Sequence, residues 1–281
     1  MTNRFHLLAL CAFLLNVVPA SASPEIPGAD RSQPNIVYIM ADDLGYGDLG
    51  CYGQKLIQTP HIDRLATRGM RFTDFYAGST VCAPSRCGLM TGLHTGHCFI
   101  RGNGKDNLRP EDVTVAEVLK RADYATGQVG KWGLGHEGTT GLPTRQGFDF
   151  FYGYLDQHHA HLYYPTFLVK NEKRVNLRNI VPDEGKWGQG VASKKIDYSP
   201  ALMMKETLGF IDEHKDERFF LYLSYTLPHA NNEATRKTGD GTAVPDHGIY
   251  KDKKWTKQNK GQAAMVTYLD QMVGQVVKRL E

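Results

Sequence analysis

A dense apolar run over residues 35–40 stops abruptly at two adjacent aspartates, Asp42 and Asp43. Such a run, rich in β-branched residues, is typical of a strand that is buried on both faces of a parallel sheet. Residues 219–225 form a second run of this kind, which ends just before His229. Strands buried on both faces need helices on both sides, and this requirement constrains the fold more than any other feature of the chain.

Segments with helical signals alternate with these apolar runs. Thr59 and Pro60 supply the start signals of a helix that Gly69 ends, and Ser199 with Pro200 opens another. We expect further helices over residues 84–91, 114–121 and 261–280, strands over 71–77 and 124–129, a hairpin within 165–180, and a long polar surface loop over 231–257. This alternation predicts an α/β fold with a doubly wound, mostly parallel sheet flanked by helices.

The first 22 residues have the pattern of a secretory signal peptide. Arg4 gives a positive start, residues 7–18 are apolar, and residues 20–22 are the small residues of a cleavage site. An N-terminal membrane anchor is the alternative, but the apolar run is too short to cross a bilayer comfortably. We therefore expect a secreted or periplasmic protein without stable membrane insertion, whose fold begins after residue 22.

The charge balance names no polyanionic partner. The chain carries 33 basic and 30 acidic residues, a net charge of +3, and we expect no nucleic-acid partner. Four of its five cysteines lie beyond the signal segment, too few for the disulfide framework of a large secreted domain and without the paired spacing of a zinc site. At least one of these cysteines needs another explanation.

Chemically reactive groups follow the predicted strands. Asp42 and Asp43, Lys131 and His229 each come directly after one, and ligands of parallel sheets bind at the carboxyl ends of the strands. Adjacent carboxylates suit a hard cation such as calcium or magnesium, although a simple turn is the alternative. Cys82 stands where a helix is expected to begin, which favours a reactive thiol, although a small buried residue is the alternative.

Cys82 also opens the segment C-A-P-S-R, which Thr91 and Gly92 follow. This segment resembles the signature of the type I sulfatases, the formylglycine-dependent arylsulfatase family of the alkaline-phosphatase-like superfamily. Residues 35–53, 59–66 and 130–135 resemble the family's opening strand, its T-P-N-I-D-R-L-A helix and its G-K-W-H-L-G segment, in the same order. The resemblance covers roughly residues 34–281 and is specific as a set.

The resemblance implies roles for individual residues. A maturation enzyme would oxidise Cys82 to Cα-formylglycine, whose hydrate is both the nucleophile and a neighbour of the metal. Asp42 and Asp43 would bind Ca²⁺, with Mg²⁺ possible. The other catalytic roles, holding the nucleophile and the sulfate and protonating the leaving oxygen, would belong to Arg86, Lys131 and His229. The implied reaction is hydrolysis of the sulfate ester of a sulfated carbohydrate or an aryl sulfate.

The chain departs from the family pattern at Gly133, where the family often has a histidine. We expect His136, or one of His158, His159 and His161, to substitute for it. We also expect the last three to bind substrate, although a loop packed on its own aromatic side chains is the alternative.

The family's later Asp-Asn metal ligands find no match, so residues 23–281 are expected to be the N-terminal part of the catalytic domain, incomplete and without the family's small C-terminal domain. Two other functions stay open at this point. One is a phosphate or phosphonate ester hydrolase of the same superfamily. The other is a non-catalytic remnant.

Overall fold

A computed structural model gives the structure of this chain and describes residues 33–281. The proposed signal peptide, residues 1–22, lies outside the described residues. Within the described part, none of the helices combines the length and the apolar character that a membrane span requires.

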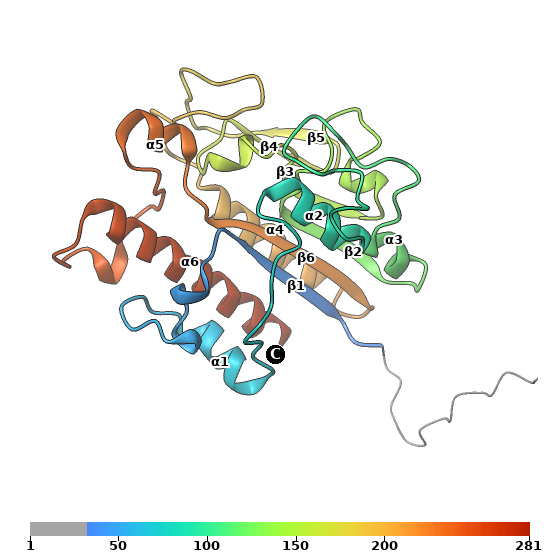
Figure 1. The fold of residues 1–281 in the computed structure, drawn as a ribbon, viewed down its shortest axis with the longest axis horizontal. Coiled ribbons are helices and arrows are strands. Elements are labelled where there is room, and N and C mark those ends of the chain that lie inside the picture. The colour runs from blue at the N-terminus through green and yellow to red at the C-terminus, as the bar shows by residue number, and fades with distance from the viewer. Residues whose placement is uncertain (1–32) are drawn as a thin grey trace, which may run out of the picture. The chain divides into compact units, whose positions relative to one another are not determined.

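Six strands form one sheet, in the order β1-β6-β2-β3-β4-β5 (Figure 1). The first four strands in this order run parallel, and they are β1 (Ile36–Asp42), β6 (Phe219–Pro228), β2 (Ala125–Lys131) and β3 (Phe150–Tyr154). An antiparallel hairpin extends the sheet, formed by β4 (Phe167–Lys170) and β5 (Lys173–Asn176). The predicted α/β fold with a mostly parallel sheet is therefore confirmed.

Helices cover both faces of the sheet. On one face lie α4 (Ser199–Glu213) and α6 (Lys257–Leu280), and on the other lie α2 (Cys82–Thr91) and α3 (Val115–Lys120). The central strand β6 serves both layers, because Leu221 and Leu223 pack in one core and Phe220 and Tyr222 in the other. This two-residue alternation explains why every residue of β6 is apolar or small and buried.

The remaining helices lie outside the two core layers. They are α1 (Pro60–Arg68), which packs on α6, and α5 (Asn232–Thr238). The expected cap Thr59 does not cap α1 with its side chain. Instead Asp270, buried on α6, accepts hydrogen bonds from the backbone N–H groups of His61 and Ile62, at 3.3 and 2.8 Å. One helix thus satisfies the free N-terminal donors of another.

Three sequence expectations about elements are wrong or incomplete. Residues 71–77 form no strand, and Phe72, Phe75 and Tyr76 are exposed there, because no neighbouring strand among the described residues pairs with this segment. The polar stretch 231–257 contains α5, which Asn231 caps by accepting from the backbone N–H of Ala234. Strand β3 was not expected at all, while the hairpin within 165–180 is confirmed.

A close backbone approach fixes the end of β2. Gly130 has φ +126°, and a Cβ atom there would lie 2.1 Å from the carbonyl oxygen of Ser224 on β6. On the other side, a Cβ atom on Gly153 of β3 would lie 1.8 Å from the carbonyl oxygen of Gly130. Only glycine fits such contacts, so the backbones of β6, β2 and β3 approach one another tightly directly before Lys131.

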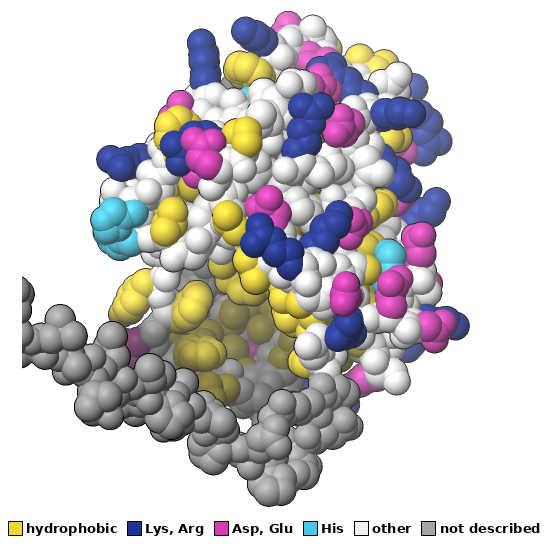
Figure 2. Space-filling view, turned by 90° about the vertical axis from the view of Figure 1, so that its right-hand side faces the viewer, with side chains coloured by type: hydrophobic (Ala, Val, Ile, Leu, Met, Phe, Trp, Pro, Cys, Tyr) yellow, Lys and Arg dark blue, Asp and Glu magenta, His cyan; other side chains and the backbone are white. Residues whose placement is uncertain are grey.

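One face of the molecule is shown in space-filling form in Figure 2. Lysine and arginine side chains are interspersed with aspartate and glutamate over most of this face, and hydrophobic side chains gather in a hollow low on it. The mixture of signs gives this face no continuous basic stripe of the kind that tracks a nucleic-acid backbone.

We expect Gly130→Ala to lower the free energy of unfolding by roughly 2–5 kcal/mol, because it adds both a backbone clash and strain at positive φ. Gly209→Ala is the matched control, since Gly209 lies exposed inside α4 with open space around its Cα. There the same change should stabilise the protein by about 0.5–1 kcal/mol. Denaturant unfolding of both variants measures this, and equal effects would contradict the proposed close packing.

Candidate active site

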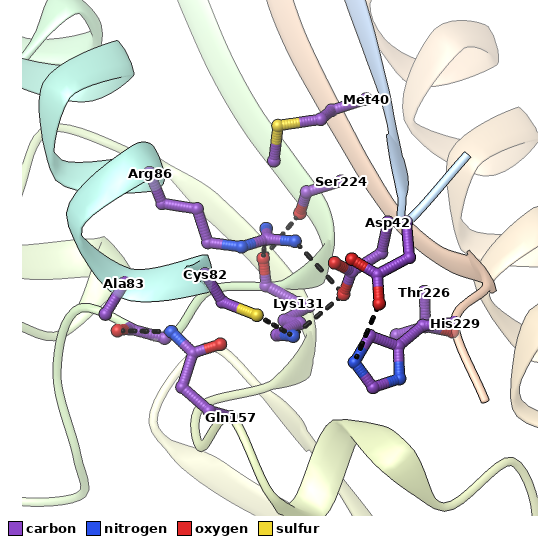
Figure 3. Close-up of polar contacts among 12 residues, drawn as sticks. Met40, Asp42, Cys82, Ala83, Arg86, Lys131, Gln157, Ser224, Thr226 and His229 are labelled. Carbon is purple, nitrogen blue, oxygen red and sulfur yellow. Dashed lines mark hydrogen bonds and ion pairs between the residues drawn. The ribbon is translucent and has the colours of Figure 1, made fainter. Parts of the chain in front are cut away.

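The candidate site lies where three parallel strands end. Asp42 is the last residue of β1, Lys131 is the last residue of β2, and His229 directly follows β6. Figure 3 shows their side chains turned toward Cys82 at the start of α2. The strand order β1-β6-β2 makes these ends neighbours, as expected for a ligand site in a parallel sheet.

Lys131 is the most deeply buried charge of the site, with 0% of its surface exposed. Its Nζ donates to Oδ2 of Asp42 at 2.7 Å and to Sγ of Cys82 at 3.2 Å. Burial alone would raise the pKa of Asp42, but the charges of Lys131 and Arg86 outweigh it and hold that pKa below its usual value. The charged form of Asp42 is therefore favoured, and Nζ of Lys131 lies between this carboxylate and residue 82.

Arg86 lies one helical turn after Cys82 and reaches the same place. Its Nη1 donates to the main-chain carbonyl of Lys131 at 2.7 Å, and its Nη2 lies 3.5 Å from Oδ2 of Asp42. The hydroxyl of Ser224 donates to the same carbonyl, also at 2.7 Å. Arg86 thus connects α2 to β2 and adds a second fixed positive charge beside Asp42.

Cys82 is the first residue of α2, and it is partly exposed. Its neighbour Val81 offers no side-chain cap, but the backbone N–H of Ala83 donates to Oδ1 of Asn103 at 2.9 Å. The helix N-terminus, Lys131 and Arg86 all contribute positive potential at Cys82. This potential favours an anion beside the side chain at position 82.

The ring of His229 is held in a defined orientation. Its Nδ1 lies 2.7 Å from the carbonyl oxygen of Ala230, and since a carbonyl only accepts, Nδ1 carries the hydrogen. Nε2 therefore faces the site, 3.4 Å from Oδ2 of Asp43. The ring of His161 stacks on His229 with centroids 4.8 Å apart. Burial lowers the pKa of His161 to about 3, with smaller electrostatic contributions in the same direction from His229 and Lys131, so His161 stays neutral.

Three side chains at this site can offer ligand atoms to one metal ion. One atom each from Asp42, Cys82 and His229 lies within 4.8 Å of the other two. Asp42 would hold such a cation while it also accepts a hydrogen bond from Lys131. Asp43, which we also expected to bind the metal, is not in this group of atoms and stands at the rim with 68% of its side chain exposed. The residues fit a metal ion, and the fit to a hard cation improves if residue 82 supplies oxygen instead of sulfur.

The residues expected to bind substrate separate into two places. His158 and His161 line a cavity of about 280 Å³ together with Cys82 and His229. His159 is instead packed into the core against Tyr154 and Phe167, and burial lowers its pKa to about 3. The structure therefore does not bring His159 to the cavity, because the short 3-10 turn that carries it points its ring inward.

His136, which we expected as a substitute for the family histidine, lies in a different cavity, beside Trp187, so it does not approach Cys82. The structure brings two other residues to the Cys82 cavity that the sequence did not indicate. Gln157 and Asn103 line the Cys82 cavity, although neither belongs to a recognisable motif. The only signal in the sequence was indirect, namely the missing side chain at Gly133.

Known proteins resemble this chain across most of its length. The Sulfatase family model matches residues 34–281. Human arylsulfatase A is 50% identical over 129 residues, which cover 43% of this chain and 25% of the human protein. N-acetylgalactosamine-6-sulfatase of Sus scrofa is 36% identical over 254 residues, which cover 83% of this chain and 45% of the pig protein.

Solved structures agree. The crystal structure of Ps i-CgsB aligns with a TM-score of 0.69 and 30% identity, covering 88% of this chain and 55% of that one. A phosphonate monoester hydrolase of Agrobacterium radiobacter aligns with a TM-score of 0.57 at 19% identity, a likeness of fold alone. The aligned part of the chain spans 25% of the human protein and 45% of the pig protein, so it covers less than half of either relative. With the family model matching nearly all of the described residues, the chain belongs to the sulfatase family.

Proposed function

We propose that the protein hydrolyses sulfate esters, with residue 82 as the nucleophile. The observation that carries this proposal is the position of Cys82, which opens α2 and lies 3.2 Å from the fully buried ammonium of Lys131. Membership of the sulfatase family supports the reaction class. The alternative hypothesis of a phosphonate ester hydrolase is supported only by a likeness of fold, and no contact at the site favours it.

A sulfate ester is an anion that repels nucleophiles, so the site must neutralise charge. Lys131 and Arg86 supply fixed donors whose orientation is set before substrate arrives. A cation held by Asp42 and Asp43 would add charge and polarise the sulfate group. We propose Ca²⁺, with Mg²⁺ as the alternative, because both aspartates offer oxygen ligands.

Cys82 is proposed to be matured to Cα-formylglycine by a formylglycine-generating enzyme, which would be a partner of this protein. A hydrated formylglycine supplies an oxygen nucleophile and a second hydroxyl that can expel sulfate as the aldehyde re-forms. The residues around position 82 suit this change, because Lys131 already donates to the side-chain atom there. An oxygen at this position would accept that hydrogen bond better than sulfur does.

His229 is suited to protonate the leaving alcohol. Its Nδ1 hydrogen is committed to the carbonyl of Ala230, so Nε2 is the atom that can carry and release a proton inside the cavity. The stacked ring of His161 limits rotation of His229. A general acid needs this kind of fixed orientation toward the bond that breaks.

The proposed substrate is a sulfated carbohydrate or an aryl sulfate. His158 and His161 line the cavity above Cys82, where an imidazole can hydrogen-bond a sugar hydroxyl. Solved structures with the Ps i-CgsB fold include one in complex with k-i-k-neocarrahexaose, an oligosaccharide. With the signal-peptide pattern of residues 1–22, we propose a secreted or periplasmic location.

Co-production with an active maturation enzyme should convert Cys82 to formylglycine and leave Cys87 a thiol. The two cysteines share one helix, but Cys87 is 1% exposed and burial raises the pKa of its thiol to about 11. Tryptic mass spectrometry measures the conversion, because cleavage after Arg86 places Cys82 and Cys87 in two separate peptides, residues 72–86 and 87–101. An unmodified Cys82, with the enzyme active on a control substrate, would refute the proposal.

Asp43→Ala should weaken Ca²⁺ binding by about tenfold or more, because a hard cation loses one carboxylate ligand. Without metal, the free energy of unfolding of this variant should lie within about 0.5 kcal/mol of the wild-type value, because Asp43 is exposed. Asp216→Ala is the control, an exposed carboxylate in the turn before β6, at the end of that strand opposite His229. Calorimetric titration with Ca²⁺ compares them, and equal affinities of the two variants would remove Asp43 from the metal site.

A further inference from the structure

The space beside Gly133 is already filled. A Cβ atom on Gly133 would lie 1.9 Å from Nε2 of Gln157, and the residue has φ +76°, a conformation that favours glycine. The amide of Gln157, which is 24 positions later, therefore occupies the volume into which a side chain at 133 would project. Gln157 thus supplies the polar group that a glycine at position 133 cannot supply.

The side-chain amide of Gln157 makes one hydrogen bond, and its oxygen atom makes none. Its Nε2 donates to the carbonyl oxygen of Gly133 at 2.9 Å. Its Oε1 is buried and has no hydrogen-bond partner among the described residues, while the residue as a whole is 7% exposed. A buried acceptor without a donor is costly, and such an atom beside a cavity can be satisfied by a group that binds there.

The direction of this free acceptor follows from the same bond. Turning the amide over would place Oε1 against the carbonyl oxygen of Gly133, two acceptors in contact, so the orientation with Nε2 on Gly133 is the one that the contacts allow. Gln157 and Cys82 line the same cavity. Figure 3 shows Gln157 beside Cys82, with its amide oxygen on the side of Cys82.

Nearby histidines are engaged elsewhere. His136 and His159 lie outside the cavity that holds Cys82. His161 is stacked on His229 and its Nδ1 lies 3.3 Å from Oε2 of Glu233. His158 has 52% of its side chain exposed, with Nδ1 directed at Asp156. Gln157 is thus the buried side chain with an unused polar atom at this cavity.

We infer that Gln157 holds the nucleophile, taking the place of a side chain at position 133. Its Oε1 accepts a hydrogen bond from a hydroxyl of residue 82 once that residue is oxidised and hydrated, and this inference rests on the proposed function. The unmodified thiol is a weak donor, whereas a hydrate offers two O–H groups. An amide accepts such a bond without taking up the proton, so Gln157 orients the hydroxyl and is not a base.

The test compares three variants of the whole protein after maturation, with activities normalised to the formylglycine content. Gln157→Ala removes the side chain, and Gln157→Met keeps its length and volume but removes the acceptor. Gln146→Ala is the matched control, because Gln146 is also buried, its Oε1 also lacks a partner among the described residues, and it lies outside the cavity. Aryl sulfate turnover and the rate of oxime formation between residue 82 and an aminooxy probe are measured.

Both Gln157 variants should lose about 10- to 100-fold in kcat/KM, the scale of one hydrogen bond to a reacting group. Both should react several-fold faster with the probe, because the hydrate loses an acceptor that stabilises it against the free aldehyde. Gln146→Ala should change neither quantity by more than about twofold. These three results together support the inference.

Two outcomes would overturn it in different ways. If the wild-type protein is matured and active, but Gln157→Met matches it in turnover and in oxime formation, then Gln157 only fills space and the inference is wrong while the proposed function stands. If the wild-type protein carries no aldehyde at residue 82 despite an active maturation enzyme, the proposed function fails and the inference fails with it.

Discussion

A fully buried ammonium group organises this molecule. The charge of Lys131 is removed from water, and such a charge is tolerated only where an opposite charge and hydrogen bonds compensate it. The compensating carboxylate of Asp42 comes from a different strand, with β6 between the two. A slip of one residue in the pairing of β1 with β6 would turn Asp42 to the opposite face of the sheet. The ion pair therefore depends on the register of three strands at once.

The same residue also positions the helix that carries the nucleophile. The main-chain carbonyl of Lys131 accepts from Arg86 on α2 and from the hydroxyl of Ser224 on β6. Through its side chain and its main chain, Lys131 connects the sheet to the helix layer that contains α2. The positive charges around Cys82 are therefore oriented before any substrate enters. Preorganisation of this kind is how an enzyme avoids reorienting dipoles during the reaction.

Much of this arrangement could be predicted from the sequence, for a physical reason. Apolar runs indicated β1 and β6, and the residues that follow parallel strands must meet at one edge of the sheet, which brought together Asp42, Lys131 and His229. The expected burial of β1 on both faces is wrong for the described residues, because β1 lies at an end of the sheet and Tyr38 is 36% exposed. The failures have a physical reason too. Residues 71–77 have strand propensity, but propensity needs a neighbouring strand. The inward turn of His159 depends on packing against Tyr154, which spacing along the chain does not reveal.

The contact between Gly133 and Gln157 was likewise invisible in the sequence, because it joins two positions whose roles make sense only together. Any side chain introduced at 133 collides with the amide, and loss of the amide leaves 133 without a substitute. The two positions are therefore epistatic. A sequence that changes only one of them passes through a less fit intermediate, whichever position changes first. Across related chains, this predicts covariation between the two sites, so neither residue can be interpreted from its own alignment column.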